Sequence, residues 1–173
     1  MAKVLNIYSK IQSLRERYYK TAVNKESLLK LLSETEVSEQ VYNSNAIENS
    51  TLTLEETEKI LLQINLDRYI SERELFEAKN LARVVSYINA RAKEQELNLE
   101  MILFLHKMLL SNIRDEVAGR FREKGEWVRV ADHVAPDPAL VVEKLQAMLV
   151  QYNSRLDENI IKRNALDHLA FEN

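Results

Sequence analysis

The stretch SERELFEAKNLARVVSYINARA, residues 71–92, decides the fold class because its apolar positions repeat at helical spacing. These positions step by three and four residues and therefore share one helix face: Leu75, Ala78, Ala82, Val85, Ile88 and Ala92. The opening Ser71-Glu72-Arg73-Glu74 has the spacing of a capping box, which marks a helix start. The stretch predicts an amphipathic helix over 71–95.

The same spacing recurs along most of the chain. A second apolar stripe runs through Val4, Ile7, Ile11, Leu14 and Tyr18. Thr53-Leu54-Glu55-Glu56 is another capping box, and Asp137-Pro138 places a capping residue before a proline in the first turn. The sequence predicts helices at 2–21, 25–33, 36–49, 54–63, 71–95, 99–111, 138–153 and 158–172.

One segment breaks the helical pattern. Residues 119–130 read GRFREKGEWVRV and hold both glycines, the only tryptophan and two runs in which large and charged residues alternate. This pattern is typical of a β-hairpin, so we expect strands only near 119–131. The four basic residues here (Arg120, Arg122, Lys124 and Arg129) are interpreted as a solvated hairpin face in preference to an anion site.

The composition excludes several classes of function. With two glycines and no cysteine in 173 residues, the chain cannot form a glycine-rich phosphate loop, a disulfide scaffold or a thiolate zinc site. The 24 basic and 27 acidic residues leave a net charge of -3 with no basic cluster, which argues against a nucleic-acid partner. No apolar run is long enough for a membrane span, and the first residues carry no signal-like apolar region. We therefore predict a cytoplasmic, single-domain protein without a membrane partner.

The histidines do not suggest a metal site. His106, His133 and His168 are far apart in the sequence and none has a second ligand at helical spacing. His106 lies at the edge of an apolar stripe, so a hydrogen-bonded structural role is favoured over catalysis.

The end of the predicted helix 36–49 carries a carboxylate at an unfavourable position. Val37, Val41, Ser44 and Glu48 share one face, and Glu48 lies in the last turn, where the helix dipole disfavours a carboxylate by about 0.3–1 kcal/mol. Spacing alone favours a plain exposed glutamate. A functional role requires Glu48 to face a cation from elsewhere, most simply an arginine.

Ser44-Asn45-Ala46-Ile47-Glu48-Asn49 resembles the S/T-x-x-x-E-G/N inhibitory motif of the Fic (Fido) domain family, which transfers AMP from ATP to protein hydroxyls. Further landmarks of that family are similar in order and spacing. They are Leu105-His106-Lys107-Met108-Leu109, Gly119-Arg120-Phe121-Arg122, Trp127-Val128-Arg129-Val130, His133-Val134-Ala135-Pro136 and Ala165-Leu166-Asp167-His168-Leu169-Ala170-Phe171. The resemblance covers residues 41–173 and implies an all-α, Fic-like bundle with one β-hairpin flap.

The resemblance also implies a division of the sequence. Residues 1–35 are an N-terminal helical extension, 36–49 the inhibitory helix and 50–173 the core. In the family, the helix containing His168 and Phe171 leads into the catalytic loop H-P-F-x-D-G-N-G-R-x-x-R, which does not occur in residues 1–173. Asn173 is expected to lie directly before this loop. We therefore expect no catalytic residue in this chain and no AMP transfer by residues 1–173 alone.

Roles for named residues follow from the same resemblance. Ser44, Glu48 and Asn49 are the inhibitory residues, and in the family the glutamate pairs with the second arginine of the catalytic loop. Gly125, Trp127, Val128 and Arg129 correspond to a flap that aligns the target segment. The implied partners are ATP with Mg²⁺ and a protein carrying a Ser, Thr or Tyr hydroxyl. Neither the nucleotide nor the metal is expected to bind tightly to this chain alone.

Three alternatives are kept open at this point. The chain could be a non-catalytic helical protein-interaction module, with the stripe from Val4 to Tyr18 and the hairpin as binding surfaces. AMP addition and AMP removal both fit the family, and the stripe could also bind a second copy of the chain as a homo-oligomer.

Overall fold

The computed structural model describes residues 2–92, 94–130, 133–155 and 160–172. Its helices are α1 (Ala2–Ala22), α2 (Glu26–Ile47), α3 (Leu54–Leu61), α4 (Glu72–Arg91), α5 (Leu99–Leu110), α6 (Pro138–Ser154) and α7 (Ile160–Glu172). Two short strands, β1 (Arg129–Val130) and β2 (His133–Val134), lie between α5 and α6. The predicted helical fold class is confirmed.

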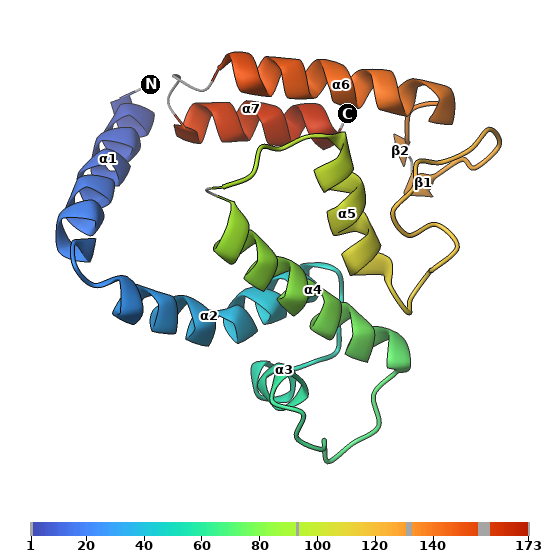
Figure 1. The fold of residues 1–173 in the computed structure, drawn as a ribbon, viewed down its shortest axis with the longest axis horizontal. Coiled ribbons are helices and arrows are strands. Elements are labelled where there is room, and N and C mark those ends of the chain that lie inside the picture. Colours follow the sequence, from blue (N-terminus) through green and yellow to red (C-terminus); the bar gives the residue numbers. More distant parts are fainter. Residues whose placement is uncertain (1, 93, 131–132, 156–159, 173) are drawn as a thin grey trace.

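Helix α4 crosses the middle of the molecule and contacts α2, α3 and α5 (Figure 1). The core between α2, α3 and α4 is built on four buried side chains, Val41, Leu52, Ile60 and Ala78. Helices α6 and α7 pack against each other as an antiparallel pair, and α1 lies at the edge of the molecule (Figure 1). No helix in the described ranges is both long enough and apolar enough to span a membrane.

A buried amide joins α4 to the end of α5. Asn80 is 2% exposed, and its side-chain N–H groups donate to the carbonyls of Leu109 and Ser111 at 3.0 and 2.7 Å. These carbonyls belong to the end of α5, where no intrahelical donor remains. Asn80 therefore sets the position at which the chain leaves α5, a role that its sequence position did not reveal.

The predicted helix starts are largely correct. Thr53 and Glu56 form the full capping box of α3, with hydrogen bonds in both directions. Ser71 accepts from the Glu74 N–H at the start of α4, and Asp137 accepts from the Ala139 N–H at the start of α6.

The two helices predicted at 25–33 and 36–49 are one helix, α2. The polar run Ser33-Glu34-Thr35 suggested a break between them. In the structure the Thr35 hydroxyl donates to the Leu32 carbonyl at 2.8 Å, so its polar group is satisfied inside the helix. Neither glycine nor proline occurs in this run, and the helix therefore continues.

The strand pairing is displaced from its predicted position. Arg129 pairs with Val134 and Val130 with His133 in an antiparallel register, and the Ala135 N–H donates to the Val128 carbonyl. The hairpin therefore does not turn at Gly125, as 119–131 implied. Residues 119–128 form turns and irregular chain, since internal side-chain bonds, described below, replace the strand ladder.

Candidate functional site

The site begins at the C-terminal end of α2. Asn49 has a φ of 63°, in the left-handed region that asparagine and glycine tolerate best. Its N–H donates to the Ala46 carbonyl at 3.2 Å, and the Ser50 N–H donates to the Asn45 carbonyl at 3.0 Å. This pair of bonds is a Schellman motif. It explains why an asparagine follows Glu48, and it fixes Glu48 as the C-cap residue.

The residues around Glu48 border a hollow of about 790 Å³, which we call the Glu48 hollow. Ser44, Glu48 and Asn49, the three residues predicted to be inhibitory, all lie on its wall. The opposite walls come from α4 and from the end of α5 with the chain that follows: Arg73, Glu74, Glu77, Leu81, Leu109, Leu110, Ile113 and Arg114. These wall residues were not predicted, because nothing in their local sequence indicates that they meet α2.

Glu48 is exposed and forms no ion pair with any described residue. The two arginines of the hollow are already paired, Arg73 with Glu77 at 2.7 Å and Arg114 with Glu116 at 3.2 Å. Asn173, which is expected to lie directly before the catalytic loop, is outside the described residues.

Glu74 fastens the chain that follows the motif. One oxygen of its carboxylate accepts from both the main-chain N–H and the hydroxyl of Thr51, each at 2.8 Å, and the other accepts from the Ser71 hydroxyl at 3.1 Å. These donors stabilise the charged form and lower the pKa of Glu74, with the Thr51 N–H as the largest cause. The segment between α2 and α3 is thus tied to the first turn of α4.

A second carboxylate secures the same segment from α3. Glu56 accepts from the Arg68 guanidinium at 2.5 and 3.0 Å and from the Thr53 N–H at 2.8 Å, while Arg68 also donates to the Thr51 carbonyl at 3.0 Å. The Arg68 hydrogen bond is the main reason that the pKa of Glu56 falls to about 2. The carboxylates of Glu74 and Glu56 therefore hold Thr51 and Thr53, the residues before and after Leu52.

The Asn45 side chain adds an unsatisfied donor to the hollow. Its Nδ2 atom is buried and has no hydrogen-bond partner among the described residues. Leaving a buried donor without an acceptor costs about 1–3 kcal/mol. The wall beside Glu48 is consequently suited to receive an acceptor from another segment.

Charged groups of both signs line the Glu48 hollow. They are the carboxylates of Glu48, Glu74 and Glu77 and the guanidinium groups of Arg73 and Arg114. In the described part of the chain, no three His, Cys, Asp or Glu side chains form a cluster that could hold a metal ion.

The predicted flap residues lie on one exposed segment. Gly125 and Trp127 border a smaller hollow of about 550 Å³ that also includes Pro138, the first residue of α6. Trp127 is 59% exposed and Val128 is exposed beside it, while Arg129 lies in β1.

Two arginines brace this segment from within. Arg120 makes a two-pronged ion pair with Glu126 at 2.7 and 2.6 Å, and Arg122 donates to the Pro136 carbonyl at 3.0 Å. Arg120 is the largest cause of the lowered pKa of Glu126, about 2. The alternation of large and charged residues thus marks an internally bonded loop, not strands.

The histidines have different surroundings. His106 accepts a hydrogen bond from the Gly119 N–H at its Nδ1 atom (3.2 Å), and partial burial lowers its pKa. This agrees with the predicted structural role. His168 is exposed on α7. Asn173 and the side chain of Phe171, which were expected with His168 next to the catalytic loop, are outside the described part, so their placement there stays a prediction. The His133 side chain is outside it as well.

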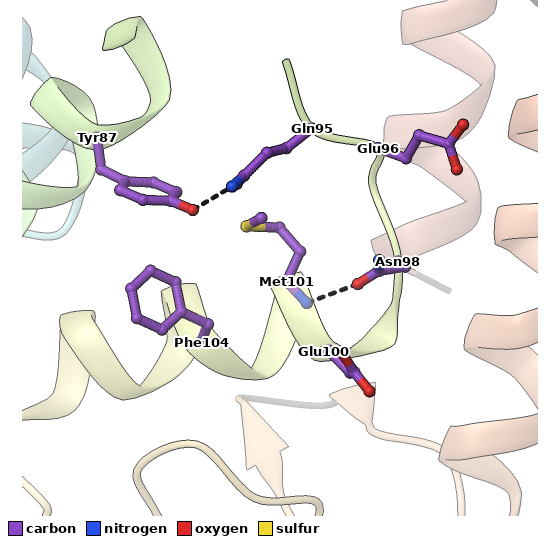
Figure 2. Close-up of a pocket in the computed structure, with 7 residues that line it drawn as sticks. All are labelled: Tyr87, Gln95, Glu96, Asn98, Glu100, Met101 and Phe104. Atoms are coloured by element: carbon purple, nitrogen blue, oxygen red, sulfur yellow. Dashed lines mark hydrogen bonds between the residues drawn. The ribbon is translucent and has the colours of Figure 1, made fainter. Parts of the chain in front are cut away.

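A separate pocket of about 390 Å³ lies where α4 leads into α5 (Figure 2). The Tyr87 hydroxyl donates to Gln95, the Tyr87 and Phe104 rings lie 5.1 Å apart, and Asn98 caps α5 by accepting from the Met101 N–H. Figure 2 shows these polar groups directed at one another. They join the two sides of the corner between α4 and α5.

Comparison with known proteins adds to this geometry. No model of a protein family matches the chain. The chain is 30% identical over 111 residues to protein adenylyltransferase Fic of Nematostella vectensis, covering 63% of this chain and 26% of that protein. It is 28% identical over 155 residues to protein adenylyltransferase Fic of Drosophila melanogaster, covering 80% of this chain and 31% of that protein. The chain thus spans less than a third of these relatives.

Two solved structures have the same fold. A Fic family protein from Desulfovibrio desulfuricans G20 superposes with a TM-score of 0.78 at 22% identity, over 99% of this chain and 51% of that one. A variant of Fic-1 from C. elegans superposes with a TM-score of 0.76 at 25% identity, over 98% of this chain and 50% of that one. The arrangement of helices is that of the Fic fold. The curated relatives and the shared fold together support a Fic (Fido) domain in this chain.

Proposed function

We propose that this chain is the regulatory and scaffold part of a Fic-type protein adenylyltransferase, in which Glu48 at the end of α2 restrains AMP transfer. The observation that carries the proposal is the Schellman end of α2, which holds Ser44, Glu48 and Asn49 on the wall of one hollow. The relatives named protein adenylyltransferase Fic support the reaction class.

The proposed restraint is electrostatic. Glu48 has no cation of its own among the described residues, so it is available to pair with an arginine brought into the hollow by a catalytic loop. An arginine held in this way cannot bind the γ-phosphate of ATP, and the Glu48 carboxylate also repels that phosphate. ATP then binds in a pose that does not favour transfer.

Several residues of this chain would support that arrangement. Glu74 and Arg68 hold the chain after the motif, which limits where Glu48 can move. The unsatisfied Asn45 Nδ2–H could donate a hydrogen bond to a carbonyl of the loop, since Asn45 lies on the same wall. Both features support the proposal, because a preorganised surface favours one defined contact.

The flap has a proposed role in binding the target protein. The exposed edge at Val128 and Arg129 offers main-chain groups for pairing with an extended target segment, a common mode of peptide recognition. Trp127, with its ring exposed, would clamp that segment. The target is a protein segment with a Ser, Thr or Tyr hydroxyl.

ATP and Mg²⁺ belong to the proposal for a protein that includes the catalytic loop. The carboxylates of the Glu48 hollow, whose two arginines are already paired with Glu77 and Glu116, argue against tight nucleotide binding by residues 1–173. General-base catalysis also needs a group within reach of the attacking hydroxyl, and the family's base lies in that loop. Residues 1–173 alone are therefore expected to give no labelled product above buffer when incubated with labelled ATP, whereas robust transfer would contradict this part of the proposal.

The main test uses an extended protein, in which residues 1–173 continue through a Fic catalytic loop and the helix after it. Glu48→Gly should free the loop arginine and raise the initial rate of AMP transfer at saturating ATP. If the lost ion pair and repulsion amount to about 2–4 kcal/mol, the gain is roughly thirty- to a thousand-fold. Glu48→Asp should give a smaller gain because the shorter side chain keeps its charge.

A matched control is Glu39→Gly in the same helix. Glu39 is exposed and lies outside the Glu48 hollow, so its loss should leave the rate within about twofold even though it also introduces a helix-weakening glycine. Equal rates for the extended wild type and Glu48→Gly would mean that Glu48 is a plain surface carboxylate.

A further inference from the structure

The carboxylate of Glu126 is the point at which the flap loop, residues 119–128, is tied together. Its two oxygens accept from the terminal nitrogens of Arg120 at 2.7 and 2.6 Å, and one of them also accepts from the Glu123 N–H at 2.6 Å. The Glu126 main chain is bonded as well. Its N–H donates to the Glu123 carbonyl at 3.0 Å, and its carbonyl accepts from Arg122 at 3.3 Å. Glu126 is therefore held through both its side chain and its backbone.

Arg120 is fixed on its own side of the pair. Its Nε atom donates to the Glu116 carbonyl at 2.8 Å. The N–H of the preceding Gly119 donates to His106 of α5 at 3.2 Å. The Arg120 guanidinium therefore connects Glu126 to a stretch of chain that is bonded to α5. Lysine could not form the same connection, because a single ammonium group lacks the planar fork of donors that matches a carboxylate.

Trp127 follows Glu126 directly, and its place depends on the main chain. The Trp127 side chain is 59% exposed, so packing of the ring against described residues restrains it little. On the other side of Trp127, the Val128 carbonyl accepts from the Ala135 N–H at 3.0 Å, next to the pairing of β1 with β2. Trp127 thus lies between two bonded points of the chain. The bonds at Glu126 involve a side chain and can be removed by one substitution, whereas the bond at Val128 joins main-chain groups.

The Arg120–Glu126 pair differs from an ordinary surface ion pair. Its side chains are 34% and 38% exposed, and the Glu126 pKa of about 2 means that the carboxylate stays charged across the physiological pH range. Arg114 and Glu116 form a second pair just before the flap loop, with a contact of 3.2 Å and side chains that are 64% and 65% exposed. Exposed pairs of this kind contribute little to stability. The second pair is therefore a suitable comparison for the first.

We propose that the Arg120–Glu126 pair is the positioning element of the flap: by holding Trp127 in place it sets the affinity for the target segment and leaves the chemical step unchanged. The proposal rests on the target-binding role of the flap proposed above. A binding surface that is already ordered loses less conformational freedom on binding, so removing the pair should weaken target binding. Arg120 and Glu126 both lie outside the Glu48 hollow, so the binding of nucleotide there should not change.

The first test uses residues 1–173, in which Trp127 is the only tryptophan. Time-resolved fluorescence anisotropy measures how freely its ring moves. Glu126→Ala should lower the residual anisotropy of Trp127, and Arg120→Lys should do the same because lysine lacks the planar fork. Glu116→Ala, which also breaks an arginine–glutamate pair, is the matched control and should resemble the wild type. Circular dichroism should show the same helix content in all variants, and equal anisotropy for the wild type and Glu126→Ala would overturn the proposal.

The second test uses the extended protein with Glu48→Gly, and unfolded casein as a probe that carries many Ser and Thr hydroxyls. Adding Glu126→Ala should raise the KM for casein at least about fivefold, while kcat and the KM for ATP stay within about twofold. Glu116→Ala should leave all three constants near their starting values. An unchanged KM for casein, or an equal rise in the KM for ATP, would overturn the proposal. If casein gained no AMP even with Glu126 intact, the proposed reaction would be wrong, and the anisotropy of Trp127 would still decide the role of the pair.

Discussion

The main-chain N–H and the side-chain hydroxyl of Thr51 both donate to the same carboxylate oxygen of Glu74, each at 2.8 Å. The two residues are 23 positions apart, and Thr51 follows the end of α2 by only a few residues. Glu74 therefore links the start of α4 to the segment that carries Glu48. A bond between a charged acceptor and a main-chain donor fixes the backbone, and not only a side chain.

Glu74→Ala should lower the free energy of unfolding by about 1–2 kcal/mol, because it removes hydrogen bonds to a charged group at a partly exposed site. Glu72→Ala is the matched control. Both glutamates lie in the first turn of α4 and interact similarly with the helix dipole, but Glu72 is exposed. The control should stay within about 0.5 kcal/mol of the wild type. Urea denaturation measures both, and equal midpoints would contradict the anchoring role of Glu74.

Gly119→Ala should be considerably more destabilising than Gly125→Ala. Both glycines have positive φ values, 76° and 95°, so either alanine is strained by about 1 kcal/mol or more. A Cβ at Gly119 would also lie 2.8 Å from the Lys107 Cβ, whereas nothing lies within 4 Å of a Cβ at Gly125. The added clash should cost a further 1–3 kcal/mol, roughly. Thermal unfolding of both variants checks the order, and equal losses would show that the contact with α5 is relieved without cost.

Stability should fall when the pH drops below the ordinary His106 pKa of 6.5. Burial lowers the pKa of His106 in the folded state, so over this window the unfolded chain binds more protons. Protonation would also remove the Nδ1 acceptor of the Gly119 N–H. The stabilising contribution is therefore present above the unfolded pKa and is lost as the pH falls.

His106→Asn is the control for this pH dependence. Its amide oxygen can replace Nδ1 as an acceptor, and it does not titrate. The melting temperature of the wild type should fall more than that of the variant between about pH 7.5 and about pH 5.5. Parallel curves would mean that other groups account for the whole acid effect.

Local signals in the sequence predicted the ends of most elements. The caps at Thr53, Ser71 and Asp137 depend on residues within three positions of one another, so the sequence contains both partners. The two predicted helices at 25–33 and 36–49 are one helix, because the Thr35 hydroxyl donates to a carbonyl within it. Sequence spacing alone does not show whether such a hydroxyl bonds inside a helix or caps the start of a new one.

Long-range partners were not predictable in the same way. Glu74 has the position of a capping-box glutamate, yet its carboxylate binds Thr51 and not the Ser71 N–H. The alternation around Gly125 indicated strands, but the Arg120–Glu126 ion pair makes a loop of the same residues. In each case tertiary packing determines which residue the charged side chain binds, and a local sequence pattern carries no information about that packing.

The last prediction concerns Asn49, whose φ of 63° holds the end of α2 in its Schellman motif. Asn49→Gly should change the unfolding free energy by less than about 0.5 kcal/mol, because glycine adopts this conformation freely. Asn49→Val should lose about 1–2 kcal/mol, because a β-branched residue is strained there. In the extended protein the same valine should also raise AMP transfer, since Glu48 is no longer held at its place on the hollow wall, while glycine should leave transfer near the wild-type rate. Urea denaturation of both variants checks the predicted stabilities, and their initial rates at saturating ATP check the predicted effect on transfer. If valine destabilised the protein without changing transfer, the conformation at Asn49 would serve the helix alone, and the inhibitory position of Glu48 would not depend on it.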